Sequence, residues 1–173
     1  MPVIKPINHI HEITNSRSFT MIIRKALESD VQSIYTMRNR AIIEKCIGFY
    51  SSSQLALWTQ GDISEALIND IVANFYVSLF KDRVIGCGKV NLETGMIDAI
   101  FVDPDNFGQG AAKSMLVFLE CRALENGLEL LQLESTLNAA SFYRACGFVG
   151  DEVSTYHSPR GIRLDCIPMR KSL

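Results

Sequence analysis

The sequence has no long apolar run, no excess of one charge and no paired cysteine motif. Its apolar stretches fall short of the roughly 20 residues that a membrane-spanning helix needs, so no membrane partner is predicted. Seventeen basic and nineteen acidic residues give a net charge of −2, which argues against a non-specific nucleic-acid-binding protein. The first residues have neither a basic start nor an apolar segment with a small-residue cleavage site, so no signal peptide is expected.

The cysteines are informative through the spacing that they lack. Their number is odd and none lies in a CxxC pair: Cys46, Cys87, Cys121, Cys146 and Cys166. This pattern predicts reduced thiols and a cytoplasmic protein. His9 and His11 have no third ligand with useful spacing, so no metal site is predicted.

Length and composition indicate one folded domain. The 173 residues fit one domain at roughly 100–200 residues per domain, and 47% hydrophobic with 21% charged residues is typical of a globular chain. Residues 1–20 contain two prolines, two asparagines and two histidines without a sustained period. We therefore expect residues 1–20 to be an N-terminal arm outside the core fold and residues 21–173 to form the domain.

The first half of the domain reads as one strand, several helices and a meander. The strand covers about 21–26, and capping signatures then start helices near Ser29, Ser51 and Asp62. Short polar turns separate three strand-like runs, which predicts an antiparallel meander over 74–80, 84–92 and 96–102.

The second half returns to alternating helices and strands. It contains a helix, a buried strand, a helix capped by Asn138 and a closing hairpin, over about 110–126, 128–133, 138–147 and 148–169. A strand, a helix and a strand in succession predict a right-handed crossover and a parallel pair. The whole predicts an α/β (α+β) domain with a mixed, mostly antiparallel sheet of six or seven strands, flanked by about four or five helices.

One segment between the third meander strand and the next helix has the features of a ligand-binding turn. It reads Phe101-Val102-Asp103-Pro104-Asp105-Asn106-Phe107-Gly108-Gln109-Gly110-Ala111-Ala112-Lys113-Ser114. No Ser, Thr or Asp directly precedes the helix, so its first N–H groups have no side-chain cap. Lys113 lies in the first turn, where a cation is unfavourable unless an anion neutralises it. These features predict a bound phosphate or pyrophosphate, with a purely structural turn as the alternative.

Three motifs in order resemble the GNAT superfamily of acyl-CoA-dependent N-acetyltransferases. They are Val102-x-Pro104, Gly108-x-Gly110-x-Ala112 and Asn138…Tyr143-x-x-x-Gly147-Phe148. The resemblance covers about residues 21–170 in element order and implies a single GNAT-like domain. The stretch Tyr50-Ser51-x-x-Gln54-Leu55-x-x-Trp58, with residues 97–102, further looks like a bacterial subgroup that acts on small molecules.

The resemblance implies acetyl-CoA as the acetyl donor and coenzyme A as a product. It implies cofactor contacts along the strand end, the glycine turn and the start of the last helix: Ile100, Phe101, Val102, Phe107, Gly108, Gln109, Gly110, Ala111, Ala112, Lys113, Ser114, Asn138, Ser141 and Tyr143. Phe107 departs from the family, which usually has Arg or Gln at this position. Because such a loop binds phosphates chiefly through backbone N–H groups, we expect binding to survive this departure.

The resemblance also implies direct attack by a neutral amine on the thioester, with Tyr143 as the proton donor to the departing thiolate. Packing on the last helix is the alternative role for Tyr143. Asp98 and Glu134 lie in the two central strands, where a lone buried charge is costly, so both are candidate general bases. A strand-end or salt-bridge role for each, and a water chain as the base, remain alternatives. Tyr50 and Trp58 are expected to line the acceptor pocket, with core packing as the alternative for Trp58.

The predicted function is acetyl transfer from acetyl-CoA to a primary amine of a small molecule in a ternary complex. The alternatives are a protein N-terminal or lysine acetyltransferase, and a non-catalytic acyl-CoA-binding sensory module. The expected partner is a small-molecule amine, without nucleic acid or membrane, and a homodimer is left open. The sequence does not name the acceptor.

Overall fold

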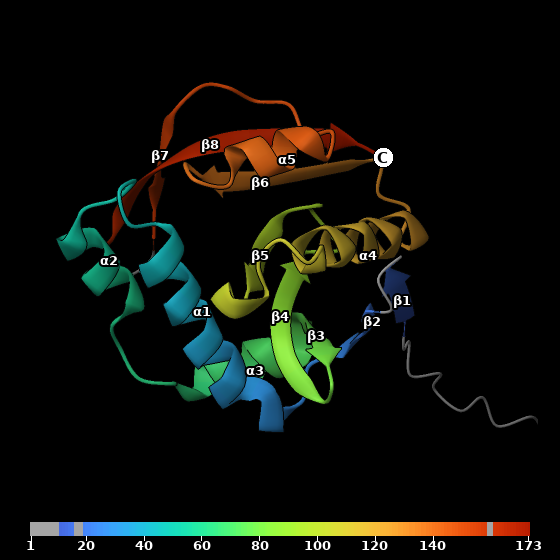
Figure 1. Cartoon of the computed structure of the whole chain (residues 1–173). Helices are drawn as coiled ribbons and strands as arrows, with labels where there is room; N and C mark the ends of the chain where they lie inside the picture. Colours follow the sequence, from blue (N-terminus) through green and yellow to red (C-terminus); the bar gives the residue numbers. More distant parts are fainter. Residues whose placement is uncertain (1–10, 16–18, 159–160) are drawn as a thin grey trace, which may run out of the picture.

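The computed structural model of the chain describes residues 11–15, 19–158 and 161–173 (Figure 1). Within these residues the strands are β1 (His11–Asn15), β2 (Phe19–Lys25), β3 (Phe75–Phe80), β4 (Arg83–Val90), β5 (Ile97–Val102), β6 (Leu130–Thr136), β7 (Ser154–His157) and β8 (Arg163–Ser172). The α-helices are α1 (Val31–Lys45), α2 (Ser52–Thr59), α3 (Glu65–Asn74), α4 (Ala111–Glu125) and α5 (Ala140–Ala145). Two short 3-10 helices, η1 (Glu28–Asp30) and η2 (Pro104–Asn106), precede α1 and α4.

The strands form two antiparallel sheets rather than one. The first has the order β1-β2-β3-β4-β5 and the second β6-β8-β7. In Figure 1 the second sheet and α5 lie above β5 and α4, while α1 and α2 flank the gap between the sheets. The α/β fold with a mostly antiparallel sheet and five α-helices in the described residues is as predicted from the sequence.

The expected parallel pair between strands 96–102 and 128–133 is formed at one point only. Met96 and Gln132 make an isolated parallel bridge, and the Gln132 N–H donates to the carbonyl of Gly95 over 3.0 Å. Beyond this bridge no ladder joins β5 to β6 within the described residues, so the two strands diverge. Their divergence leaves a split in the sheet, and the fold therefore has a hollow where a continuous parallel sheet would be closed.

The N-terminal arm predicted over residues 1–20 is wrong in part. Residues 11–15 form β1, which pairs antiparallel with β2, for example His11 with Ile23 and Asn15 with Phe19. Without β1, the outer edge of β2 would present unpaired backbone groups, and the added strand satisfies them. Residues 1–10 and 16–18, including His9, lie outside the described residues.

Helix starts follow the predicted capping chemistry in one case, α2, whereas the cap predicted near Ser29 is wrong because α1 follows Asp30 and has no side-chain cap. Ser51 accepts from the N–H of Gln54 and Gln54 Oε1 accepts from the N–H of Ser51, the reciprocal box that the sequence predicts for α2. For α3 the cap is Ser64, whose hydroxyl accepts from the N–H of Leu67, and not the predicted Asp62. The predicted Asn138 cap is wrong as well: α5 follows Ala139 and has no side-chain cap.

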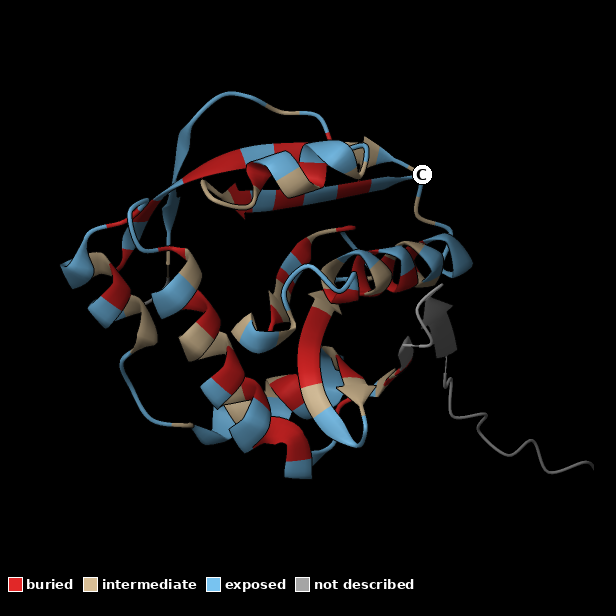
Figure 2. Ribbon diagram, viewed as in Figure 1, coloured by how far each residue is buried: buried red, intermediate tan, exposed pale blue. Residues whose placement is uncertain are grey.

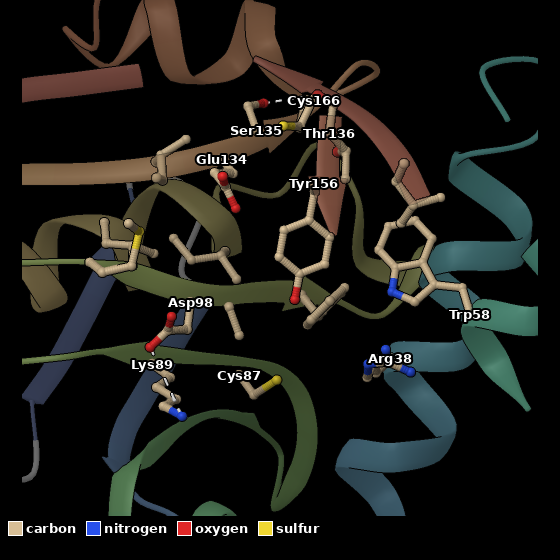
Figure 3. A pocket seen from close by; sticks show the side chains of 18 of the residues that line it. Arg38, Trp58, Cys87, Lys89, Asp98, Glu134, Ser135, Thr136, Tyr156 and Cys166 are labelled. Carbon is tan, nitrogen blue, oxygen red and sulfur yellow. Dashed lines mark hydrogen bonds and ion pairs between the residues drawn. The ribbon is translucent and has the colours of Figure 1, made fainter. Parts of the chain in front are cut away.

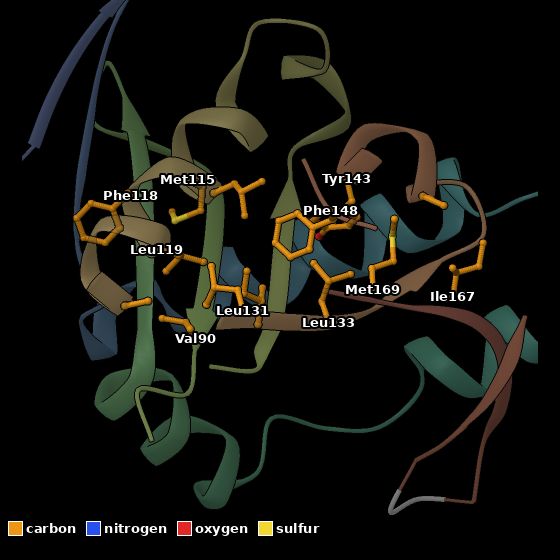
Figure 4. Close-up of a cluster of buried hydrophobic side chains, with 14 of the residues drawn as sticks. Val90, Met115, Phe118, Leu119, Leu131, Leu133, Tyr143, Phe148, Ile167 and Met169 are labelled. Atoms are coloured by element: carbon orange, nitrogen blue, oxygen red, sulfur yellow. The ribbon is translucent and has the colours of Figure 1, made fainter. Parts of the chain in front are cut away.

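The main core lies between α4 and the strands on either side of the split. Figure 4 shows Met115 and Leu119 of α4 facing Leu131 and Leu133 of β6, and all four side chains are buried. Gly88 in β4 allows the helix to come close, since an added Cβ would lie 2.7 Å from the Met115 Cγ. The alternation of buried and exposed residues along β6 is visible in Figure 2. This packing fixes the start of α4 beside the end of β5.

Within the described residues, no helix combines the length and the apolar character that a membrane span requires.

Candidate active site

Two cavities adjoin the split between β5 and β6. One has a volume of about 360 Å³ and is lined from α1, the β5–α4 connection and α5. The other has a volume of about 460 Å³ and is lined from α1, α2, α3, α5 and all of the strands from β3 to β8. We call them the α4 cavity and the β4 cavity. Four residues line both, namely Ile100, Phe101, Ala139 and Tyr143, so the two cavities meet at these side chains.

The α4 cavity contains most of the residues that the sequence assigned to cofactor binding. Its lining includes Ile100, Phe101, Val102, Phe107, Gly108, Gly110, Ala111, Ala112, Lys113, Asn138 and Tyr143. Gln109, Ser114 and Ser141 were also predicted but do not line it, and Ser141 is exposed on α5. The structure therefore brings eleven of the fourteen predicted residues to one cavity and leaves three outside.

The start of α4 is an open set of backbone donors. Gly110 is the N-cap, in the left-handed conformation at φ +84°, and supplies no side-chain cap. Gly108 is also left-handed, at φ +75°. Among the described residues, no acceptor is bonded to the N–H groups of Ala111, Ala112 or Lys113. These unpaired donors, at the positive end of the helix dipole, are suited to an anion.

Backbone groups of β5 also face the split. The Asp103 N–H donates to the Ile85 carbonyl over 2.9 Å, which sets the alternation of the ladder between β4 and β5. In this alternation the backbone groups of Ile100 and Val102 point away from β4, toward the side where β6 diverges. They form an unpaired strand edge along the α4 cavity.

Residues of α1 complete the α4 cavity, and sequence reasoning missed them. Ala41, Ile42, Lys45 and Cys46 line it, at positions spaced by one helical turn. The Lys45 Nζ lies 4.4 Å from the centroid of the Phe107 ring, and Phe107 is 47% exposed. The one available signal was this i, i+4 spacing, and it does not reveal which distant loop the helix faces.

An arginine of α1 ties the helix to the loop before α4. Arg40 contacts Asp103 and Asp105 through its two Nη atoms, at 3.3 Å each. Asp103 is 7% exposed, and its carboxylate also accepts from the N–H of Asp105 over 3.0 Å, which caps η2. The network positions the β5–α4 connection against α1.

Tyr143 lies where the two cavities meet. It is 8% exposed and packs edge-on against Phe142 and Phe148, with ring centroids 5.0 and 5.7 Å apart. Within the described residues its hydroxyl has no hydrogen-bond partner, while the residue lines both cavities. Burial raises the pKa of Tyr143, so the hydroxyl keeps its proton at neutral pH.

Asn138 lies in the α4 cavity but does not cap α5. Its side-chain oxygen accepts from the Cys46 thiol over 3.4 Å, which joins the β6–α5 connection to the end of α1. Burial raises the pKa of Cys46 to about 11 and that of Cys87 to about 12. Neither thiol is therefore activated as a nucleophile.

Both predicted general bases face the β4 cavity. Figure 3 shows Asp98 and Glu134 extending into it from β5 and β6. The Asp98 side chain is 40% exposed, and burial raises its pKa while the nearby Lys89, 3.9 Å away, opposes this change. Lys89 also pairs with Asp70 over 2.9 Å. One lysine therefore serves two carboxylates, and Glu134 has no ion-pair partner among the described residues.

The predicted acceptor residues, Tyr50 and Trp58, both line the β4 cavity. Their rings meet edge-on at 5.8 Å. The Tyr50 hydroxyl donates to the carbonyl of Asp165 over 2.6 Å and accepts from the N–H of Leu137 over 3.1 Å. Tyr50 is buried and bonded to two backbone groups, so it braces the wall of the cavity, whereas Trp58 remains available to a ligand.

Several residues of the β4 cavity were missed by sequence reasoning. They come from five elements, namely α1, α3, β4, β7 and β8, and carry charge or an aromatic ring: Tyr35, Arg38, Asp70, Lys89, Tyr156 and Asp165. No local motif marks any of them. Their common position follows only from the packing of α1, α3, β4, β7 and β8 around the split.

Comparison with known proteins identifies one matching family model. Residues 72–150 match the family model described as an acetyltransferase (GNAT) domain. These residues include β4, β5, the whole α4 start and α5. No curated protein matches the chain in sequence.

Solved structures show the same fold at low sequence identity. The GCN5-related N-acetyltransferase from Rhodopseudomonas palustris has a TM-score of 0.80 and 23% identity, covering 87% of this chain and 94% of that chain. PaiA N-acetyltransferase from Thermoplasma acidophilum, in complex with coenzyme A, has a TM-score of 0.70 and 18% identity, covering 88% and 99%. YncA from Salmonella typhimurium, with its cofactor acetyl-CoA, has a TM-score of 0.64 and 20% identity, covering 88% and 94%.

Proposed function

We propose that the chain, of which residues 72–150 match a GNAT acetyltransferase domain, transfers the acetyl group of acetyl-CoA to a primary amine of a small molecule. The observation that carries the proposal is the junction of two cavities at Tyr143. One cavity has unpaired donors for an anionic cofactor, and the other has carboxylates for a cationic amine. A group-transfer enzyme needs both reactants to meet in line at one point.

The α4 cavity would hold acetyl-CoA. The N–H groups at the start of α4 would bind its phosphates, with Lys113 as a nearby cation. The unpaired edge of β5 at Ile100 and Val102 would bind the amide-containing pantetheine arm and polarise the thioester carbonyl. Acetyl-CoA supplies the activated acetyl group; the chain supplies the donors that orient it.

The β4 cavity would hold the acceptor. An amine enters as an ammonium ion and must lose a proton before it can attack, and Asp98 or Glu134 would receive that proton. The raised pKa of Asp98 brings its proton affinity closer to what a base needs near neutral pH. Lys89, 3.9 Å away, opposes this rise because its charge favours the ionised carboxylate.

Tyr143 would donate a proton or a hydrogen bond to the departing sulfur. It lies at the junction, it is protonated at neutral pH, and its hydroxyl has no partner among the described residues. Attack by the amine breaks the C–S bond and leaves the thiolate of coenzyme A. A positioned hydroxyl lowers the cost of that developing charge.

The volume of the β4 cavity supports a small acceptor. About 460 Å³ falls within the roughly 300–1,000 Å³ of small-molecule sites. Trp58, Tyr156 and Phe101 give it aromatic walls. Rings and carboxylates together favour a compact cationic amine.

The test is thiol release from acetyl-CoA with a panel of small amines, and acetylated products identified by mass spectrometry. We expect turnover with small amines, and no turnover with peptides that offer a lysine side chain or a free N-terminus. Turnover with peptides alone would replace the proposal by a protein acetyltransferase. Tight binding of acetyl-CoA without turnover of any acceptor would favour the non-catalytic sensory module.

A further inference from the structure

The α4 cavity contains a cation whose position the glycine turn does not explain. Lys45 is the last residue of α1, it is partly buried, and its Nζ lies 4.4 Å from the centroid of the Phe107 ring. Both residues line the cavity, together with the start of α4. The aromatic ring holds the ammonium group in place through a cation–π contact.

The cations of this cavity have no anion to balance them. Among the described residues, no carboxylate pairs with Lys45 or Lys113. The acidic groups close by are already engaged, because Glu44, Asp103 and Asp105 all contact Arg40. Two unbalanced cations and the unpaired N–H groups of α4 thus line one space of about 360 Å³.

We propose that Lys45 is a phosphate-binding residue of the cofactor site, held by Phe107 so that its ammonium group faces the phosphates bound at the start of α4. The inference rests on the proposed function for the identity of the ligand. It assigns to α1 a part in binding the donor, in addition to its part in the acceptor cavity. Phe107 then acts as the support of a cation supplied by another element.

A structural role for Lys45 is the competing explanation. A cation in the last turn of a helix interacts favourably with the helix dipole, and this requires no ligand. If this is the role of Lys45, removal of its charge would lower the stability of the folded protein and leave the affinity for the cofactor unchanged. Affinity and stability must therefore be measured separately.

The experiment measures coenzyme A binding by calorimetry for the parent, Lys45→Met, Lys45→Arg and Lys81→Met. Lys81 is a matched control, since its Nζ lies 5.3 Å from the Phe80 ring but outside the cavity. We expect Lys45→Met to weaken binding about tenfold, the lower end for a hydrogen bond to a charged group. Lys45→Arg, which keeps charge and stacking, and Lys81→Met should both stay within about threefold of the parent.

Ligands that differ in phosphate identify the contact. Pantetheine has no phosphate, so Lys45→Met should bind it as the parent does. A tenfold loss that persists with dephospho-coenzyme A assigns the contact to the diphosphate, and a loss that disappears assigns it to the 3′-phosphate. Either result supports the inference.

Equal coenzyme A affinity in the parent and in a folded Lys45→Met variant would overturn the inference, as would an equal loss toward pantetheine. If Lys45→Met does not fold, Lys45→Gln replaces it in the same comparison. Failure of the parent to bind coenzyme A would instead refute the proposed function, so the two failures are distinguishable.

Discussion

The two cavities that meet at Tyr143 are built in different ways. The α4 cavity owes its anion-binding character to backbone groups within one continuous segment, from the edge of β5 through Gly110 to Lys113. The β4 cavity owes its character to side chains from ten helices and strands, among them the charged residues Arg38, Asp70 and Glu134. Backbone donors suit the cofactor phosphates, which are the same in every turnover. Side chains from separate elements allow the β4 cavity, the proposed acceptor site, to change without disturbing the α4 cavity, the proposed cofactor site.

The largest expected effect is at the junction itself. Tyr143→Phe keeps the ring and removes the hydroxyl, so packing and coenzyme A affinity should stay close to those of the parent. The chemical step should slow by roughly 10²–10⁴-fold, the usual contribution of a positioned acid. Stopped-flow or steady-state assays should show the loss in kcat and kcat/KM together. Because burial raises the pKa of Tyr143, the parental rate should show no titration of this group between pH 6 and about 9. A parental rate in the variant, with chemistry limiting, would assign Tyr143 to packing alone.

The second largest effect is expected from a substitution that disrupts the α4 cavity. Gly110→Val places a β-branched residue at φ +84° and forces the turn to rearrange, so coenzyme A affinity should fall by roughly 10–100-fold. Gly127→Val is the matched control. It is also left-handed, at φ +77°, but lies beyond the other end of α4 with open space around it. It should lower the melting temperature and leave the affinity unchanged, and calorimetry of both folded variants decides the point.

The third prediction distinguishes between the two carboxylates of the β4 cavity as the general base. If Asp98 is the base, Asp98→Asn should lower kcat/KM about tenfold, since water can partly replace it, and remove the acid limb of the pH–rate profile. Glu134→Gln should keep that limb. The reverse pattern would move the role to Glu134, and two unchanged profiles would leave a water chain as the base.

Stability against pH gives an independent check on Asp98. Burial raises the pKa of Asp98, so the folded state holds its proton to higher pH than the unfolded state. Unfolding then releases a proton, and this group costs stability as pH rises from the ordinary value near 4 toward the raised one. The unfolding free energy of Asp98→Asn relative to the parent should therefore increase over that range. A constant difference would show that the carboxylate feels no net burial.

The smallest expected effect is at Phe107. Phe107→Arg introduces the residue type usual at this position in the family that the sequence resembles, and the backbone donors of α4 remain. Coenzyme A affinity should stay within about threefold of the parent or become tighter. The substitution removes the ring that supports Lys45, but it adds a guanidinium group that can itself bind phosphate. A folded variant with a much larger loss would show that the Phe107 ring itself contacts the ligand.

The same contrast explains what could be predicted from the sequence. The anion-binding part of the α4 cavity is formed by residues that are adjacent in the sequence. The glycines, the uncapped helix and Lys113 together therefore indicate an anion site without knowledge of the fold. Lys45 was missed because it reaches that site from α1 across the packed interface. Asp70, Lys89 and Asp165 were missed for the same reason: each is an ordinary surface-type residue until the fold brings it to the cavity.

The errors in the fold prediction also have local causes. Ser64 caps α3 although Asp62 fits the same pattern, since both precede a helical run and only the backbone geometry selects between them. Asn138 was expected to cap α5, but its side chain turns to Cys46 instead. Residues 11–15 lack a clear period, and they form β1 because β2 offers an open edge.

The unpaired edge of β5 has a consequence for isotope exchange. The amide hydrogens of Phe101 and Ala99 lie within the ladder to β4, whereas those of Ile100 and Val102 face the split. In the free protein the amides from Ala99 to Val102, on one side of the irregularity in the β4–β5 ladder, should therefore exchange with deuterium in an alternating pattern, slow at Ala99 and Phe101 and fast at Ile100 and Val102. A ligand that occupies the split would slow the even-numbered amides and leave the odd-numbered ones unchanged. Deuterium exchange of the β5 amides would therefore show whether a ligand occupies the split, without an assay of acetyl transfer.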